Sequence, residues 1–334
     1  MIAISARISV ELDIFRHIVN DGPVTSARLA KLCGAEELLI ILLLRLLSAL
    51  HFMEEVAPYT WDATRITRII ATEEIAAGHR MISQLIVPAM QSAPSYLQER
   101  GRSCPADPGD GLMQYAFQSK LGTFERISLD SSLLKDFNMF MGNTMGARTY
   151  WVDWYPVKTR ILDRVEPEKP LIVDVGGGKG HDLLAYNGKF PGTGRLVLQD
   201  LQVVMESLGD LDQVITKVTY DFFKEQPIKG ARVYFYHHFL HDWSDDYCVR
   251  ILARAVSAMA IGYSKLLLHE MIVPERRASQ FQAQFDLTMM AFNGGLERTE
   301  KQWGALLKRA GLDEIKIWHP IDEGGDGIIE AMKH

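Results

Sequence analysis

The sequence predicts an α/β protein in which a mostly parallel sheet follows a mainly helical, winged-helix-like N-terminal region. Three observations predict it. From Pro170 onward, short apolar runs alternate with helical stretches, the pattern of βα units in a parallel sheet. The first apolar run continues into a glycine-rich turn, Gly176–Gly180, and the second ends in an acid, Asp200. We therefore expect two domains, residues 1–155 and residues 156–334.

The N-terminal region reads as a small helical module. We expect an amphipathic helix over Ile8–Asn20 and a second over Ala27–Cys33, between a Thr-Ser cap and Gly34. A third helix covers Glu36–Leu50, and Phe52–Ala63 suggests a β-wing. This order of helices and wing is that of winged-helix domains, many of which bind DNA.

The third helix argues against DNA as a partner. It reads ELLIILLLRLLSAL, with Arg45 as its single base, whereas a recognition helix presents polar and basic side chains to base edges. The formal net charge of -6 also disfavours a nucleic-acid partner. We expect this helix to be buried in the protein or in a subunit interface.

The C-terminal region contains the sheet. Expected strands are Leu171–Val175, Arg195–Gln199, Val214–Thr219, Ala231–Tyr236 and Lys265–His269, with a terminal pair at Glu314–Trp318 and Gly327–Met332. Expected helices between them are Gly180–Lys189, Asp245–Ala260 and Thr299–Ala310. The first strand is almost wholly apolar, which is typical of a strand covered on both faces.

The glycine turn predicts a nucleoside cofactor without phosphates. The sixth position from Gly176 is His181, so the dinucleotide pattern G-x-G-x-x-G fails. No Lys-Ser/Thr pair follows Gly180, so a P-loop fails as well. Asp200 ends the second strand, where a carboxylate accepts hydrogen bonds from ribose. These features favour S-adenosylmethionine.

Further polar clusters follow the later strands, at the sheet edge where ligands bind. Asp221 can accept a hydrogen bond from an adenine amino group, and Phe222 can stack on the base. His241 follows the fourth strand, and Glu270 and Glu297 follow later in the chain. A histidine between two carboxylates would act as a general base near its ordinary pKa of about 6.5.

A metal site is the rival interpretation of His237, His238, His241, Glu270 and Asp286. The first three follow a strand rather than lying on one helical turn, and no H-E-x-x-H pattern accompanies them. We therefore expect no metal.

Composition places the chain among ordinary globular proteins. It has 334 residues, of which 47% are apolar and 23% charged. Three separated cysteines form no disulfide framework, and the N-terminus shows no signal pattern. The run Leu38–Leu50 is too short to span a bilayer. We expect a cytoplasmic protein without a membrane partner.

Aromatic and methionine side chains gather in Phe137–Tyr155. Core packing explains such a cluster, and so does a pocket for a flat, apolar, aromatic substrate. The two interpretations are compatible.

These segments together carry a resemblance to a known family. VDVGGGKG, LQD, YDFF, HHFLHDWSDD, HE and NGGLERT resemble the class I S-adenosylmethionine-dependent O-methyltransferases of the plant caffeate/flavonoid type, and most of all their fungal secondary-metabolite relatives. The resemblance covers nearly the whole chain. It implies a Rossmann-like class I methyltransferase sheet with an antiparallel final strand, an N-terminal dimerisation domain and a homodimer.

The resemblance also implies a role for each matching residue. The catalytic set would be His241, Glu270 and Glu297. The cofactor-binding set would be Asp174, Gly176, Gly177, Gly178, Gly180, Asp200, Leu201, Asp221, Phe222 and His237, and the substrate-binding set Trp154, His238, Asp242, Met289, Met290 and Asn293. The substrate would be a small aromatic or polyketide-type molecule methylated on a phenolic or enolic hydroxyl.

This sequence departs from the family pattern at two places. His237 stands where plant members usually carry lysine and fungal members often carry arginine. The chain opens almost directly at the helix Ile8–Asn20, without part of the family's leading arm, so we expect a weaker or different dimer.

Two other functions stay open. Some fungal proteins that resemble this family are pericyclases or dehydratases that keep the cofactor without transferring its methyl group. A catalytically silent cofactor-binding subunit is the third option. The intact set of His241, Glu270 and Glu297 favours methyl transfer over both.

Overall fold

The computed structural model describes residues 1–146, 149–320 and 325–333, which form two compact units. The first unit contains Met1–Ser103 and Leu112–Ala147, and the second contains Cys104–Gly111 and Arg148–His334. The division into domains at residue 155 stays a prediction.

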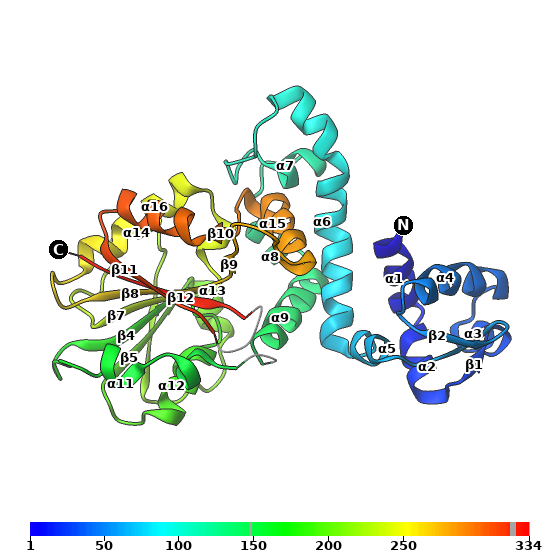
Figure 1. The fold of residues 1–334 in the computed structure, drawn as a ribbon, viewed down its shortest axis with the longest axis horizontal. Coiled ribbons are helices and arrows are strands. Elements are labelled where there is room, and N and C mark those ends of the chain that lie inside the picture. The colour runs from blue at the N-terminus through cyan, green and yellow to red at the C-terminus, as the bar shows by residue number, and fades with distance from the viewer. Residues whose placement is uncertain (147–148, 321–324, 334) are drawn as a thin grey trace. The chain divides into compact units, whose positions relative to one another are not determined.

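The second unit is built on a seven-stranded sheet in the order β11-β12-β8-β7-β4-β5-β6 (Figure 1). Its strands are β4 (Pro170–Val175), β5 (Arg195–Asp200), β6 (Ile215–Thr219), β7 (Val233–His237), β8 (Lys265–Glu270), β11 (Asp313–Trp318) and β12 (Gly327–Met332). The neighbours β6, β5, β4, β7 and β8 run parallel, whereas β12 runs antiparallel to both β8 and β11. The α/β fold class and the antiparallel final strand are confirmed.

Helices cover both faces of this sheet (Figure 1). Alternate residues of each strand point to opposite faces, so Val173 and Tyr234 pack with α14 (Asp245–Ala258) and α16 (Glu300–Arg309). Ile172 and Phe235 pack instead with α12 (His181–Lys189), and also with α10 (Trp151–Trp154) and α11 (Val157–Arg160). Burial on both faces explains why these strands are continuous apolar runs.

The second unit also contains elements that carry the loops at the carboxyl edge of the sheet. These are α13 (Gln202–Ser207), the 3-10 turn η1 (Leu240–Asp242), α15 (Gln280–Asn293) and the small parallel pair β9 (Ile272–Val273) and β10 (Arg298–Thr299).

The first unit is mainly helical. Its elements are α1 (Ile2–Glu11), α2 (Ile14–Asp21), α3 (Ser26–Cys33), α4 (Glu37–Ala49), α5 (Arg65–Ile70), α6 (Glu73–Arg100), α7 (Leu112–Ala116), α8 (Thr123–Leu129) and α9 (Ser131–Gly146), with a small sheet of β1 (Val24–Thr25), β3 (Thr60–Asp62) and β2 (Glu54–Ala57). None of its helices or those of the second unit, as far as the chain is described, is both long and apolar enough to cross a membrane.

One prediction for this unit was wrong. The expected helix over Ile8–Asn20 is two helices, because the chain turns at Asp13, whose φ of 53° lies in the left-handed region. Helix α4 packs Ile40, Leu44 and Leu47 inward, whereas Leu38 and Leu42 are more than half exposed, so burial of its other face in a subunit interface stays a prediction. The side chains on both faces of α4 are apolar, so hydrophobicity alone could not separate the face that packs inward from the face that does not.

A buried carboxylate on β12 accepts hydrogen bonds from side chains of several elements of the second unit. Glu330 on β12 accepts hydrogen bonds from Tyr155 Oη (2.9 Å), Trp318 Nε1 (3.0 Å) and the side chains of Arg160 and Lys265. Burial by itself would raise the pKa of Glu330, but the bonds from Arg160 and Lys265 outweigh it and lower the pKa to about 2.

We expect Glu330→Gln to lower the free energy of unfolding by about 3–5 kcal/mol, because it leaves Arg160 and Lys265 without their buried counter-charge. Since the folded-state pKa of Glu330 is depressed, the stabilisation is present above about pH 4.5 and is lost as the pH falls toward 2. Urea unfolding at pH 7 and pH 3 measures both effects. The control is Glu225→Gln, which removes an exposed pair with Lys229 and should change stability by less than about 0.5 kcal/mol. Equal stability of the two variants would contradict this role of Glu330.

Candidate active site

The glycine turn between β4 and α12 has a backbone that side chains would obstruct. Gly176, Gly178 and Gly180 have φ of 72°, 55° and 75°, values that favour glycine. A Cβ on Gly176 would lie 2.6 Å from the ring of Phe239, and a Cβ on Gly177 would collide with the carboxylate of Asp174. The turn therefore leaves its backbone open to close approach by a ligand.

Two buried carboxylates flank this turn. Asp174, at the end of β4, is 1% exposed, and neither of its oxygens has a hydrogen-bond partner. Burial, and then the nearby carboxylates of Asp182 and Asp200, raise the pKa of Asp174 well above its ordinary value. Asp200, at the end of β5, accepts hydrogen bonds from the backbone N–H groups of Gly178 (2.9 Å) and Leu201 (2.7 Å). Each carboxylate oxygen of Asp200 keeps a further lone pair for a hydroxyl donor.

Aromatic rings lie beside the turn. The ring of Phe222 meets that of Phe239 edge-on, with centroids 4.6 Å apart, and that of Trp243 at 5.7 Å. Phe239 in turn contacts the position of Gly176, so it connects the glycine turn to Phe222. Asp221 Oδ1 accepts a hydrogen bond from the backbone N–H of Phe223 at 3.0 Å. Leu201, which caps α13, is 42% exposed.

His241 lies in η1, just beyond the carboxyl end of β7, and is almost fully buried. Its Nδ1 donates to Glu297 Oε1 at 2.7 Å and lies 3.9 Å from Glu270 Oε2. Its Nε2 lies 3.8 Å from Asp242 Oδ1. Because Nδ1 donates to a carboxylate, Nε2 is the ring nitrogen left to exchange a proton with a ligand.

The carboxylates decide the protonation state of His241. Burial by itself would lower the pKa of His241, but Glu270, Asp242 and Glu297 raise it to about 10. Burial also raises the pKa of Asp242 to about 7 and that of Glu270 above its ordinary value. The expected pKa of about 6.5 for His241 is therefore wrong, since a buried imidazole among three carboxylates holds its proton far more tightly than one in water.

Buried polar contacts hold η1 in place. Glu270 Oε1 accepts hydrogen bonds from the backbone N–H groups of Phe239 (3.0 Å) and Leu240 (2.8 Å). Arg298, which is fully buried, donates to the carbonyls of Leu240 (3.2 Å) and Trp243 (2.8 Å). The turn that carries His241 is thus held at both ends.

The segment that carries Glu297 packs directly against this turn. The backbone N–H of Leu296 donates to the His241 carbonyl at 2.9 Å, and a Cβ on Gly295 would collide with that carbonyl. Asp286 Oδ1, on α15, accepts the backbone N–H of Glu297 at 2.8 Å. These contacts explain why the glycines of the NGGLERT segment and Asp286 accompany the histidine–glutamate pair.

Of the expected substrate residues, His238 and Asn293 contact His241 or the turn that carries it. The ring of His238 is 5.2 Å from that of His241, and its Nε2 lies 2.8 Å from Asp326 Oδ2. Asn293 donates to the backbone carbonyl of Asp242 at 3.2 Å, so it braces the turn. Other members of the expected set occupy α15 and α10: Met289 is buried, Met290 half-buried, and the half-buried Trp154 has its ring 6.2 Å from that of His269.

No role in this site was assigned from the sequence to Asp182, His269 or Phe285. His237 Nδ1 donates to Asp182 Oδ2 at 2.8 Å, and its ring lies 4.0 Å from that of His269. Phe285, on α15, places its ring 5.7 Å from that of His241. Register between β7 and β8 pairs His237 with His269, and only a strand order known in advance could have revealed that pair.

We expect Glu297→Gln to lower the pKa of His241 below 10, because it removes a counter-charge 2.7 Å from Nδ1. NMR titration of the His241 Cε1–H signal measures this change. The raised pKa stabilises the fold below about pH 6.5, and that contribution disappears as the pH rises through 10. The control is Glu300→Gln, whose exposed carboxylate pairs with His319. An unchanged titration of His241 in Glu297→Gln would show that Glu297 does not set its charge.

Comparison with known proteins identifies the family of this chain. The model of the O-methyltransferase domain matches residues 152–313. O-methyltransferase penC of Penicillium thymicola is 57% identical over 334 residues, covering 100% of this chain and 84% of that protein. O-methyltransferase asqD of Emericella nidulans is 58% identical over 336 residues, covering 100% of this chain and 87% of that protein.

Solved structures share the fold. LepI in complex with SAM superposes with a TM-score of 0.87 at 26% identity, covering 99% of this chain and 86% of that one. OxaC in complex with SAH and oxaline gives a TM-score of 0.84 at 26% identity, covering 100% and 85%. The mitomycin 7-O-methyltransferase MmcR gives 0.78 at 26%, covering 100% and 94%.

The residues present fit S-adenosylmethionine, the cofactor of this family. The open glycine backbone gives room for close approach, and the unpartnered carboxylate of Asp174 suits a cationic group. Asp200 offers acceptors for ribose hydroxyls, and no phosphate-binding motif is needed. With relatives more than 55% identical over its full length, this chain belongs to the S-adenosylmethionine-dependent O-methyltransferases, among relatives from fungal secondary metabolism.

Proposed function

We propose that this enzyme methylates a phenolic or enolic hydroxyl of a small aromatic or polyketide-type molecule, with His241 as the general base. The contact between His241 Nδ1 and Glu297 Oε1, at 2.7 Å, carries the proposal. It fixes the ring so that Nε2 is the proton acceptor, and it stabilises the imidazolium that forms.

The proton step follows from the charges around His241. A phenol has a pKa of about 10, which matches the pKa of about 10 that the surrounding carboxylates give His241. Once His241 is neutral, the hydroxyl proton moves to Nε2 at little free-energy cost, and the oxygen is left as the nucleophile for a methyl group. When bound, S-adenosylmethionine supplies that methyl group on a positively charged sulfur. Glu270 and Glu297 hold the imidazolium in place during the transfer.

The cofactor set is proposed in the same way. Asp200 would bind the ribose hydroxyls, while Asp221 and Phe222 would hold the adenine. The glycine turn and His237 would border the methionine part, and the buried carboxylate of Asp174 would face its positive charges. The polar and aromatic contacts among these residues support this assignment.

The substrate would lie against α15, next to His241. The ring of Phe285 offers an apolar surface there, and Asp242 offers a polar group beside Nε2. With a pKa of about 7, Asp242 can donate as well as accept a hydrogen bond near neutral pH. This mixture suits a flat ring that carries a hydroxyl.

We expect His241→Gln to lower kcat by about 10²–10⁴-fold, the usual contribution of a general base. In the unaltered enzyme, kcat/KM should rise by about tenfold per pH unit below the pKa of His241, and this dependence should weaken in the variant. Steady-state kinetics from pH 6 to 10 measures both. The control is His319→Gln at an exposed site. Full activity of His241→Gln on the true substrate would refute the assignment.

A second candidate function is a pericyclic or dehydration reaction that keeps the cofactor but transfers no methyl group. The structural similarity to LepI and to a solved structure of a pericyclic reaction enzyme, with TM-scores of 0.87 and 0.86, favours it. Substrate conversion with S-adenosylhomocysteine in place of the methyl donor would support this candidate, because methyl transfer is then impossible.

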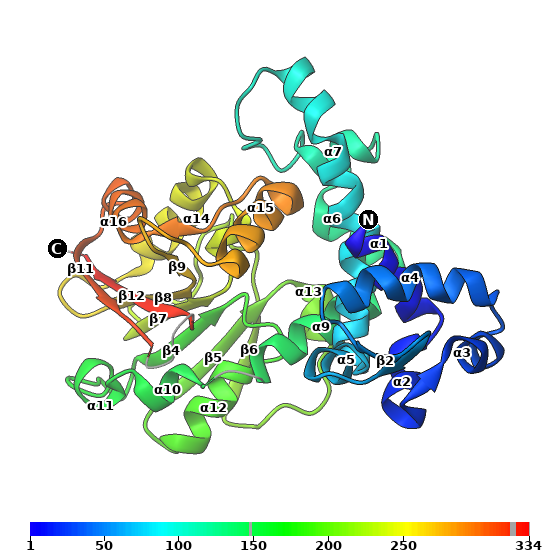
Figure 2. The same ribbon diagram turned by 45° about the vertical axis from the view of Figure 1, so that its right-hand side comes forward.

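The N-terminal unit would act as the dimerisation domain, with a winged-helix-like arrangement of α2, α3, α4 and the small sheet. Helix α1 packs beside α4 (Figure 2), and both helices carry exposed apolar residues. On α4 these are Leu38, Leu39 and Leu42, and at α1 they are Met1, Ile2 and Ile4. Exposed apolar residues on two adjacent helices suit contact with a second copy of the chain. All three cysteines are free, which suits the reducing cytoplasm in which we propose that the enzyme works.

We expect the double variant Leu38→Glu/Leu42→Glu to weaken self-association by about 100-fold or more, since each buried leucine contributes about 1.5–3 kcal/mol. Sedimentation velocity over a concentration series measures the dimer fraction. The control is Ile261→Glu, an exposed apolar residue of the second unit, which should leave the dimer intact. A monomeric parent protein, or a double variant that still dimerises, would contradict this interface.

A further inference from the structure

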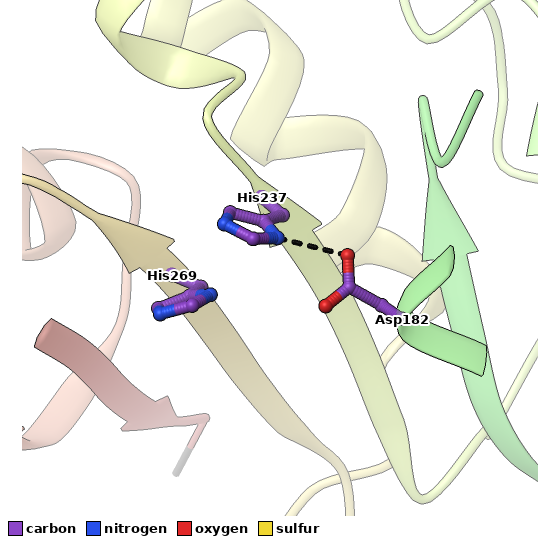
Figure 3. Close-up of side chains that lie close together, drawn as sticks. All are labelled: Asp182, His237 and His269. Atoms are coloured by element: carbon purple, nitrogen blue, oxygen red, sulfur yellow. Dashed lines mark hydrogen bonds and ion pairs between the residues drawn. The ribbon is translucent and has the colours of Figure 1, made fainter. Parts of the chain in front are cut away.

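Three side chains from separate elements meet at the carboxyl edge of the sheet: Asp182, His237 and His269 (Figure 3). His237 and His269 end the neighbouring parallel strands β7 and β8 and are partners in register. Asp182 lies in the first turn of α12, two residues after the glycine turn. One ligand atom from each residue lies within 4.8 Å of the other two.

The set is buried and held by regular structure. Asp182 is 5% exposed and His269 6%, and the side chain of His237 is 10% exposed. Figure 3 shows the His237 ring facing the Asp182 carboxylate, with the His269 ring beside it. Because two strands and a helix supply the three groups, little chain entropy is lost when they bind a common ligand.

The donor types are those of a transition-metal site. Two imidazoles and one carboxylate form the set that Zn²⁺ and other divalent first-row metals accept in proteins. Around a tetrahedral ion with bonds of about 2.1 Å, donors lie about 3.4 Å apart, so the present spacing needs only small side-chain rotations. The proton between His237 Nδ1 and Asp182 Oδ2 would leave as the metal binds.

The surroundings favour a cation. Asp174 is buried without a hydrogen-bond partner, and Asp182 and Asp200 lie near enough to raise its pKa further than burial alone does. A dication in this group of carboxylates would offset their mutual repulsion.

We propose that Asp182, His237 and His269 bind a divalent first-row transition metal, with at least one coordination position left open to a small oxygen ligand. The five residues considered for a metal from sequence do not form such a group among the described residues; only His237 belongs to this one. A second group, of His237, His238 and Asp326, shares His237. We assign the metal to the first group because two of its three members, Asp182 and His269, are buried, whereas Asp326 is the single buried member of the second.

The test is titration of the metal-free full-length protein with Co²⁺ and, separately, Zn²⁺, followed by calorimetry and by the visible absorption of Co²⁺. We expect one equivalent to bind. The near-isosteric variants Asp182→Asn and His269→Gln should each weaken binding by about 100-fold or more, beyond the 10–100-fold typical of lost outer-sphere contacts. Asp326→Asn and the exposed control His319→Gln should bind as the parent does, and thermal melting verifies that each variant is folded.

Three results would overturn the site. The first is no stoichiometric binding of either metal, and the second is binding by Asp182→Asn and His269→Gln that is as tight as binding by the parent. The third is loss of binding in Asp326→Asn alone. The titration requires neither methyl donor nor methyl acceptor. Its failure would therefore leave the proposed methyl transfer untouched.

Discussion

The buried guanidinium of Arg298 connects the two segments on which the chemistry depends. It donates to Leu240 and Trp243 on either side of the turn that carries His241, and to the carbonyl of Leu296, the residue before Glu297. Its charge is balanced by Asp245 at 2.9 Å, and its plane lies over Trp303. A buried charge is tolerated only when its donors are matched, so this arrangement admits one relative position of the turn and the glutamate.

The position of the His241 turn relative to Glu297 decides which charges surround the imidazole. Glu270, Glu297 and Asp242 surround one imidazole in a region closed to water, and each acid gains by keeping His241 protonated. Two further buried carboxylates, Asp174 and Asp182, lie beside the glycine turn. The interior of the second unit is thus arranged around positive charge, which an imidazolium and a cationic cofactor both provide. Preorganised charge of this kind needs no rearrangement during reaction.

The sequence predicted the sheet well because its signals are local. Strands buried on both faces are continuous apolar runs, and the glycines with positive φ mark the turn after β4. The signal was weaker in the N-terminal unit, where one left-handed residue, Asp13, divides a helix that the apolar period joins. Leu38 and Leu42 on α4 look like core residues, since only the fold decides which face packs inward.

In the candidate site, too, the sequence predicted some features and could not predict others. Motifs located His241, Glu270 and Glu297, but not the pKa of about 10, because that value arises from three charges that meet only in the folded chain. Phe239 and His269 lie within motifs but had no role assigned from the sequence, and Asp182 lies outside the motifs. Phe239 follows from the close approach of Gly176, and His269 from the register of β7 with β8. Contacts made by strand pairing are what single-sequence reasoning cannot supply.

The most direct test of the account is mass spectrometry of products formed with S-adenosylmethionine that carries a deuterated methyl group, using a panel of phenols and enolic polyketides. The account predicts a product that gains the intact labelled methyl group on oxygen, together with an equal amount of S-adenosylhomocysteine. A product that forms without the label, or a label found on carbon or nitrogen, would contradict it.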